Sequence, residues 1–154
     1  MFFNYFIITL AVFAPLFNAY PFIDPKDKGI CYNQGPVYAC GFNLGTKNPR
    51  LEIVYKSTGV LWNPQDTEPI TDLNAWYSIN GKAATAGPFK RNYGIDLPLD
   101  NSTLTIPQTD TSKSWSVQLA FFRLDGSWDS IYGKNYRFDF KKSDQLSKYP
   151  YLKK

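Results

Sequence analysis

Alternation of apolar and polar residues restricts the fold of this chain more than any other feature. Apolar side chains occupy every second position in residues 115–121 (WSVQLAF), 136–140 (YRFDF) and 51–55 (LEIVY). Successive side chains of an extended strand point to opposite faces, so this period of two predicts strands with one buried face. We expect Trp115, on the most regular of these segments, to be buried. Shorter strand candidates are residues 76–79, 94–97 and 104–106.

Turn-forming dipeptides separate these segments. They are Asn63-Pro64, Asn80-Gly81, Gly87-Pro88, Leu97-Pro98 and Asp125-Gly126. Such pairs favour tight turns, and no stretch of the chain has a convincing helical periodicity. Many short strands with turns between them predict an all-β fold, an antiparallel immunoglobulin-like β-sandwich over residues 43–140.

Residues 1–19 are almost wholly apolar and contain no charged side chain. This pattern predicts a secretory signal peptide that is cleaved after Ala19, and hence a secreted, extracellular protein with no membrane segment after its removal. A retained anchor is the alternative, because Phe17 is larger than the small residue usual at its position and the segment lacks an early Lys or Arg. Asn4, Pro15 and Asn18 interrupt the apolar run, which makes it short for a membrane span.

Cys31 and Cys40 are the only cysteines of the chain, and export favours their oxidation. A bridge between them closes a loop of about ten residues, worth about 2.5–3 kcal/mol in the chain-entropy model. We therefore predict a disulfide within an N-terminal segment, residues 20–42. Metal binding is a poor alternative, because the chain has no His and two thiolates do not complete a zinc site.

The formal net charge of +4 comes from a basic C-terminal tail, residues 141–154. This tail holds five lysines and one aspartate, whereas residues 20–140 are neutral. A neutral body does not supply the contiguous positive groove that a phosphate backbone requires, so nucleic-acid binding is disfavoured. We expect the tail to aid solubility.

Residues 124–140 (LDGSWDSIYGKNYRFDF) carry more functional information than any other part of the chain. They place aromatic rings beside Asn, Asp and Lys in a turn-rich loop between two expected strands. Aromatic faces cover the C–H faces of a pyranose, and neighbouring polar groups bond its hydroxyls, so the segment favours sugar binding. The alternative for each ring is simple core filling, the commoner role of Trp and Tyr in β-domains.

The sequence DGSWD at 125–129, followed by GKNYRF at 133–138, resembles the C-terminal signature of starch- and glycogen-binding carbohydrate-binding modules. These families commonly end in D-G-x-W-D-N-N-x-G-x-N-Y-x-F. The segment LEIVYK at 51–56, with Trp62-Asn63 after it, is similar to their first core strand and Trp-bearing loop. The resemblance spans roughly residues 43–140, is specific only in its last part, and implies a non-catalytic immunoglobulin-like sandwich that binds α-glucan.

The resemblance assigns roles to individual residues. Trp128 matches the stacking aromatic, Asn135 the amide that bonds glucose hydroxyls, and Trp62 an aromatic partner from the earlier loop. Lys134 lies beside Asn135 as a further polar contact, and residues 136, 138 and 140 match core positions. Ser130 and Ile131 replace the usual Asn residues and so remove their amides. Tyr132 offers a further stacking face, which would keep sugar binding and alter which polymer is bound.

Hydrolysis is disfavoured although Asp125, Asp129 and Asp139 lie close in sequence, as the paired carboxylates of glycosidases can. Asp125 precedes Gly126 as turn chemistry requires, and we expect Asp129 to hydrogen-bond its own loop. The chain also lacks His, a spare Cys and a Gly-rich phosphate loop, so we predict that it is not an enzyme and needs no cofactor.

Asn101-Ser102-Thr103 is a glycosylation sequon, expected on a water-facing turn after Asp100 if the chain is exported from a eukaryotic cell.

Two functional hypotheses follow from the sequence. The first is a secreted carbohydrate-binding protein that contacts a polysaccharide, most simply a glucan, through Trp62, Trp128, Tyr132, Lys134 and Asn135. The second is a secreted, effector-like sandwich that uses the same aromatic surface to bind another extracellular protein.

Overall fold

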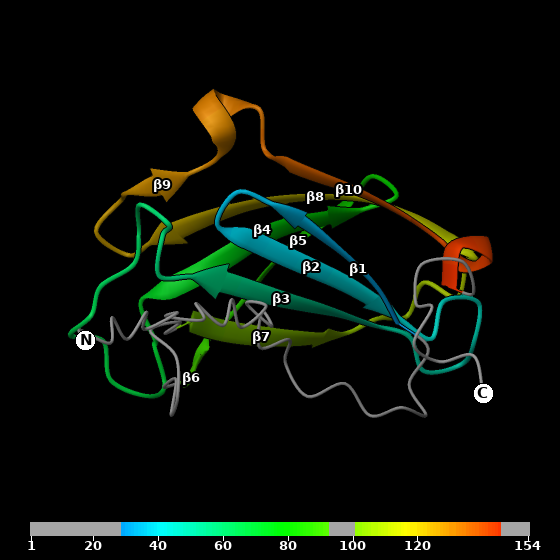
Figure 1. Ribbon diagram of the computed structural model, residues 1–154, viewed down its shortest axis with the longest axis horizontal. Coiled ribbons are helices and arrows are strands. Elements are labelled where there is room, and N and C mark those ends of the chain that lie inside the picture. The colour runs from blue at the N-terminus through cyan, green and yellow to red at the C-terminus, as the bar shows by residue number, and fades with distance from the viewer. Residues whose placement is uncertain (1–28, 93–100, 146–154) are drawn as a thin grey trace, which may run out of the picture.

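The computed structural model describes residues 29–92 and 101–145, which form two antiparallel β-sheets packed together (Figure 1). In strand order, the first sheet is β1 (Gly29–Gln34), β2 (Val37–Phe42), β3 (Arg50–Lys56), β7 (Asn101–Pro107) and β6 (Lys90–Asn92). The second sheet is β10 (Tyr136–Lys141), β8 (Ser114–Arg123), β4 (Leu73–Ile79) and β5 (Lys82–Ala86), with β9 (Trp128–Asp129) paired to β8. Short 3-10 helices are η1 (Ile131–Gly133) and η2 (Lys142–Gln145). The predicted all-β sandwich is confirmed, while its immunoglobulin-like character stays a prediction.

Several sequence expectations lie outside the described residues. They are the signal peptide at 1–19, the strand at 94–97, and the part of the basic tail beyond η2. Among the residues that the structure describes, no helix has the length and apolar character to cross a membrane.

The core between the sheets follows from the alternation of the strands. On β8, Trp115, Val117, Leu119 and Phe121 are all at most 1% exposed, while residues 114 and 116 face solvent. The apolar residues of β10 at 136, 138 and 140 are likewise buried. Removing these side chains from water supplies the main stabilisation of the fold, and the expected burial of Trp115 is confirmed.

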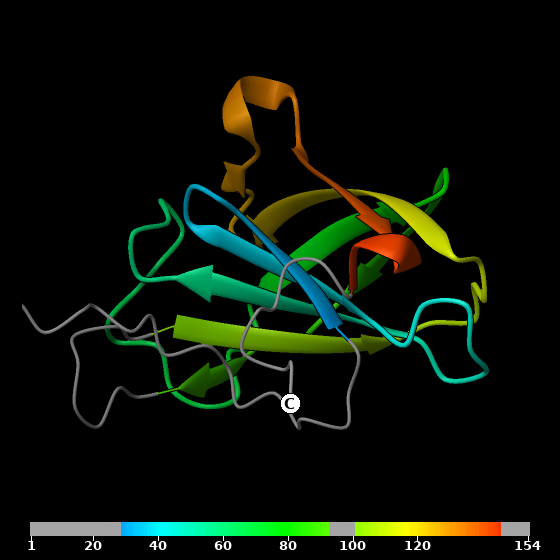
Figure 2. The ribbon, with the colours of Figure 1, turned by 45° about the vertical axis from the view of Figure 1, so that its right-hand side comes forward.

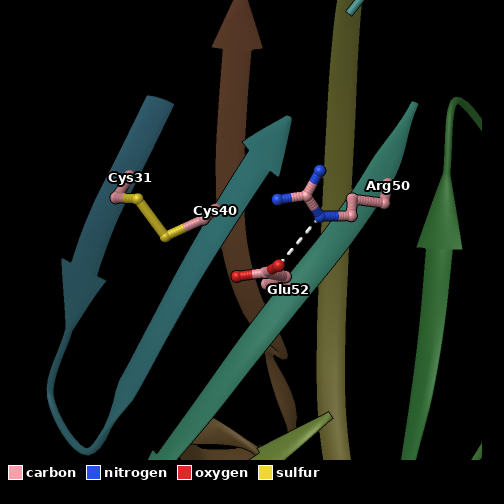
Figure 3. Close-up of a disulfide and its surroundings, with 4 residues drawn as sticks. All are labelled: Cys31, Cys40, Arg50 and Glu52. Carbon is pink, nitrogen blue, oxygen red and sulfur yellow. Dashed lines mark hydrogen bonds and ion pairs between the residues drawn. A yellow bond between two sulfur atoms is a disulfide. The ribbon is translucent and has the colours of Figure 1, made fainter. Parts of the chain in front are cut away.

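The N-terminal hairpin belongs to the sandwich, which differs from the expected boundary at residue 43. β1 pairs with β2, and β2 pairs with β3 over its whole length. The first sheet therefore includes β1 from Gly29 onward, because β2 is buried along nearly its whole length and pairs in register with both β1 and β3. The predicted Cys31–Cys40 disulfide is confirmed and joins directly opposite residues of β1 and β2 (Figure 3).

Turn chemistry closes the hairpins as the sequence predicts. Asn80 and Gly81 join β4 to β5 with φ values of 50° and 83°, the left-handed pair that suits a two-residue hairpin.

On the opposite side of the sandwich, the backbone N–H of Arg137 on β10 donates to the Gln34 side chain at 3.0 Å. Tyr32 on β1 also donates to Asp144 in η2, so both contacts link the first sheet to the second.

Candidate functional site

The chain leaves the edge of the second sheet between β9 and β10. Residues 130–135 project from the body of the sandwich, above β8 and β10 in both views (Figures 1 and 2). Tyr132, Gly133 and Asn135 have φ values of 50°, 79° and 53°. Left-handed backbone at two non-glycine residues costs energy and is concentrated at functional sites. We call residues 124–135 the aromatic loop.

Two rings of the aromatic loop are open to solvent. The Trp128 side chain is 56% exposed and stacks on Phe122 of β8, with ring centroids 4.8 Å apart and planes inclined by 27°. Tyr132, at the tip in η1, is fully exposed. Stacking on Phe122 holds one face of the indole against the sheet and leaves the other face for a ligand.

Polar groups flank these rings. Asn135 is half-buried, and its side-chain amide donates to the Gln118 side chain at 3.4 Å. Lys134, next to it, is exposed. Four of the expected site residues, at 128, 132, 134 and 135, therefore lie on the short segment between β8 and β10.

Trp62 lies in a different setting from Trp128. It sits on the loop between β3 and β4, half-buried against the core, with the guanidinium carbon of Arg91 4.8 Å from its ring centroid. Arg91 is on β6, at the edge of the first sheet. The cation covers one face of this ring. The ring stacked on Trp128 is Phe122 rather than Trp62, and a sugar-binding role of Trp62 stays a prediction.

A buried carboxylate anchors the aromatic loop. Asp129 is 8% exposed and accepts hydrogen bonds from the hydroxyls of Tyr55, at 2.5 Å, and Tyr136, at 2.8 Å. The Tyr55 oxygen in turn accepts from the backbone N–H of Leu61 at 3.1 Å. The expectation that Asp129 bonds its own loop is therefore wrong, because β9 turns this side chain inward, toward hydroxyls from β3 and β10.

The tyrosines of this network stay protonated. Burial raises the pKa of Tyr55 far above its ordinary value, and the hydrogen bond to Asp129 adds to the rise. Burial and the same carboxylate also raise the pKa of Tyr136. A neutral hydroxyl facing a carboxylate makes a strong hydrogen bond in a low-dielectric interior, so Asp129 fixes the position of Trp128 beside it.

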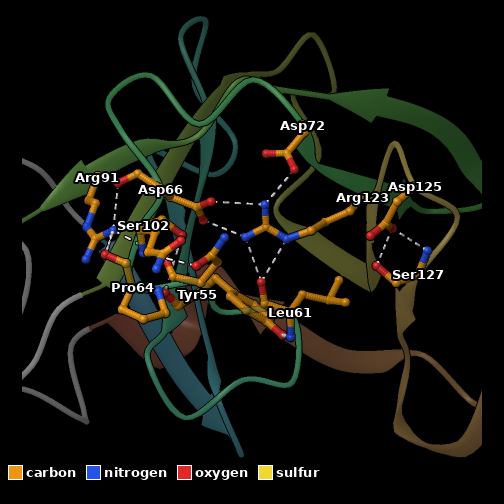
Figure 4. Close-up of polar contacts among 12 residues, drawn as sticks. Tyr55, Leu61, Pro64, Asp66, Asp72, Arg91, Ser102, Arg123, Asp125 and Ser127 are labelled. Carbon is orange, nitrogen blue, oxygen red and sulfur yellow. Dashed lines mark hydrogen bonds and ion pairs between the residues drawn. The ribbon is translucent and has the colours of Figure 1, made fainter.

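Two buried arginines hold the β3–β4 loop (Figure 4). Arg123 donates to the backbone carbonyl of Leu61 at 2.7 and 2.9 Å and pairs with Asp66 and Asp72 at 2.5 and 2.7 Å. Arg91 donates to the carbonyls of residues 63, 64 and 66 at 3.3, 2.9 and 2.7 Å. Because Leu61 also bonds Tyr55, this loop and the aromatic loop share one support.

The three carboxylates weighed for hydrolysis occupy three different environments. Asp125 accepts from the hydroxyl and the backbone N–H of Ser127, which lower its pKa and confirm its turn role. Asp129 faces the interior, and Asp139 is exposed on β10. No group of three or more His, Cys, Asp or Glu side chains within the described ranges is arranged to hold a metal ion.

The sequon differs from its expected place on a turn. Asn101 is the first residue of β7, half-buried, and its side-chain oxygen accepts from the Asn92 amide of β6 at 2.9 Å. Ser102 is fully buried, and its hydroxyl donates to the Tyr55 carbonyl at 3.4 Å. Pairing with β3 and β6 extends the strand to this point and explains the difference.

Sequence reasoning missed Phe122, which supports Trp128, and Trp76, which lies on the same sheet. Both occupy the polar parity of alternating strands, beside Gln118 on β8 and Asn74 on β4. A large ring at a position where alternation predicts a polar residue was the available signal.

Comparison with protein-family models, curated proteins and solved structures gives no match to this chain.

Proposed function

We propose that this protein is a secreted, non-catalytic carbohydrate-binding sandwich that holds a polysaccharide against the aromatic loop. The observation that carries the proposal is the Trp128 ring, backed by Phe122 on one face and 56% exposed. A pyranose covers such a ring with its C–H face, and the ring is already fixed before binding, so little side-chain entropy is lost.

The neighbours of Trp128 suit a neutral hydroxylated ligand. Asn135 supplies an amide, Lys134 an ammonium group and Tyr132 a second ring, and all three lie within seven residues of Trp128 along the loop. Sugar hydroxyls act as both donors and acceptors, and an amide matches both roles. A glucan is the ligand that the resemblance to starch-binding modules favours.

Retention on insoluble polysaccharides tests this function. Starch, cellulose, chitin and β-glucan are each incubated with the purified protein, and Trp fluorescence is followed on adding soluble oligosaccharides. We expect retention on at least one polymer and about tenfold weaker binding by Trp128→Ala, since one stacked ring is worth on the order of 1–1.5 kcal/mol.

Leu124→Ala is the matched control, because Leu124 is 73% exposed in the same loop but has no ring. Its retention should equal that of the parent. A folded Trp128→Ala variant that binds every polymer as well as the parent would contradict the proposal, as would a folded parent that binds none.

A protein partner is the second candidate. The exposed large apolar side chains of the described residues are Val60, Leu124, Trp128 and Tyr132. They lie on the β3–β4 loop and the aromatic loop, which Tyr55 and Arg123 connect, and aliphatic side chains suit a protein surface better than a sugar. Loss of a pulled-down extracellular protein on Leu124→Ala, without polysaccharide binding by the parent, would favour this candidate.

A further inference from the structure

The outer face of the second sheet continues the site beyond the aromatic loop. Trp128 pairs with Phe122 across β9 and β8, and Phe122 pairs with Asn74 of β4. One step along the strands, Ala120 of β8 pairs with Trp76 of β4. Directly paired residues of antiparallel strands share a face, so all five side chains lie on the outer surface of the sheet.

Three rings on this face form an aromatic strip: Trp128, Phe122 and Trp76. Trp128 and Phe122 are stacked at 4.8 Å. Phe122 and Trp76 are diagonal neighbours on adjacent strands, a separation of about 7–8 Å that large side chains span. The strip therefore runs obliquely across three neighbouring strands.

Ala120 shows that larger side chains cover this part of the outer face. It carries only a methyl group and points outward, yet it is 3% exposed. Larger neighbours on the same face, Phe122 and Trp76 among them, must therefore cover it. Large side chains therefore close over the outer face between β4 and β8.

Polar side chains on either side of the strip are suited to a neutral ligand. Gln118 pairs in register with Arg137 of β10 and accepts from Asn135. Asn74, beyond Phe122, donates to the Asp72 carbonyl. In these rows of the described strands the polar groups are amides, hydroxyls and one guanidinium, which match sugar hydroxyls without requiring a charge on the ligand.

We propose that the aromatic strip binds an extended, ribbon-like polysaccharide chain, of the chemistry of a neutral β-1,4-linked glycan. The proposal rests on the proposed carbohydrate-binding function and names its ligand class. A ribbon-like chain extends in one direction, so successive sugar units can reach Trp128 at one end of the strip and Trp76 at the other. A helical α-glucan curves away from such a row of side chains, and the Arg91 guanidinium already covers one face of Trp62, the second ring expected for it.

Chain-length dependence is the experiment that tests this inference. Calorimetric titration of the full chain uses cello-oligosaccharides and malto-oligosaccharides from the disaccharide to the hexasaccharide. We expect cello-oligosaccharides to bind more tightly as they lengthen. Trp76→Ala should weaken the hexasaccharide about tenfold and leave the disaccharide nearly unchanged, whereas Trp128→Ala should weaken both.

Two further variants make the outcome decisive. Trp76→Tyr keeps a stacking ring and should restore most of the hexasaccharide affinity. Thr105→Ala changes an exposed side chain of β7, on the first sheet and away from the strip, and should bind as the parent does.

Tighter binding of the malto series would overturn the ligand class. Equal hexasaccharide binding by Trp76→Ala and the parent would overturn the strip, and if Trp128→Ala still lost binding, the proposed function would stand without it. Absence of binding to either series and to every insoluble polymer would overturn both proposals.

Discussion

The two sheets treat the aromatic residues of their outer faces in opposite ways. On the first sheet, the Arg50 guanidinium lies 4.2 Å from the ring centroid of Phe42, and the Lys56 ammonium lies 4.5 Å from that of Tyr38. Phe42 is completely buried although it lies outside the main core cluster. A cation of the protein itself therefore covers each of these rings.

On the second sheet, rings cover rings. Trp128 stacks on Phe122 and keeps 56% of its surface in water, next to Trp76 on the same face. On the first sheet cations of the protein cover these rings, whereas Trp128, the outer ring of the stacked pair on the second sheet, stays largely in water. This difference, rather than the number of aromatic residues, is our reason for placing the proposed binding surface on the second sheet.

The largest expected effect comes from removing Asp129, the buried carboxylate that anchors the aromatic loop. Asp129→Ala leaves the buried hydroxyls of Tyr55 and Tyr136 without their acceptor. We expect the free energy of unfolding to fall by about 3–5 kcal/mol, because two buried hydroxyl donors are each left without an acceptor. Polysaccharide binding should weaken as well, since Trp128 loses its fixed neighbour. Urea unfolding and retention assays measure the two effects.

Asp129→Asn is the matched control for this change. It keeps the shape and one acceptor oxygen, so it should lose less stability and retain more binding than the alanine variant. Unchanged binding in a folded Asp129→Ala protein would show that binding by the aromatic loop does not depend on this buried carboxylate.

The next largest effect concerns the first sheet. Replacing Cys31 and Cys40 together by Ser removes a cross-link between β1 and β2. We expect the free energy of unfolding to fall by about 2.5–3 kcal/mol, chiefly through the greater freedom of the unfolded chain. Polysaccharide retention should stay at the parental level, because the bridge lies on the first sheet. A parallel loss of binding would break the contrast between the faces.

Local pattern was enough to predict much of the fold. Alternation located β3, β8 and β10, the dipeptide Asn80-Gly81 located a hairpin, and chain export suggested the disulfide. Each depends on residues close together in sequence, where strand periodicity and turn conformation decide the structure.

Long-range register decided what the sequence did not reveal. The partner of Asp129 is Tyr55, 74 positions away, and Trp62 is held by Arg91 of another strand. The strip exists only because β4 pairs with β8 in a register that sets Trp76 diagonal to Phe122. A shift of one residue in the pairing would turn either ring to the other face of the sheet, so no local pattern could predict the aromatic strip.

The smallest expected effect comes from removing Arg50, the cation that covers Phe42 on the outer face of the first sheet. Arg50 covers Phe42 and pairs with Glu52 at 2.8 Å, with both charged side chains about a quarter exposed. Arg50→Ala removes one cation–π contact and one partly exposed ion pair, so we expect a loss of about 1 kcal/mol in urea unfolding. Glu52→Gln keeps the cation over the ring and should lose about half as much.

Arg50→Ala also tests whether the covering cation is the only difference between the outer faces of the two sheets. Phe42 stays wedged against Gly29, where an added Cβ would lie 2.2 Å from the ring, so removing Arg50 uncovers only part of one face. We therefore expect Arg50→Ala to gain no retention on starch, cellulose, chitin or β-glucan. A gain would mean that the cations are the only barrier on the first sheet and that its rings are otherwise equivalent to the aromatic strip. No gain, together with weaker binding by Trp76→Ala, would show that a row of adjoining rings is required, because a single uncovered ring offers too little contact area to hold a chain.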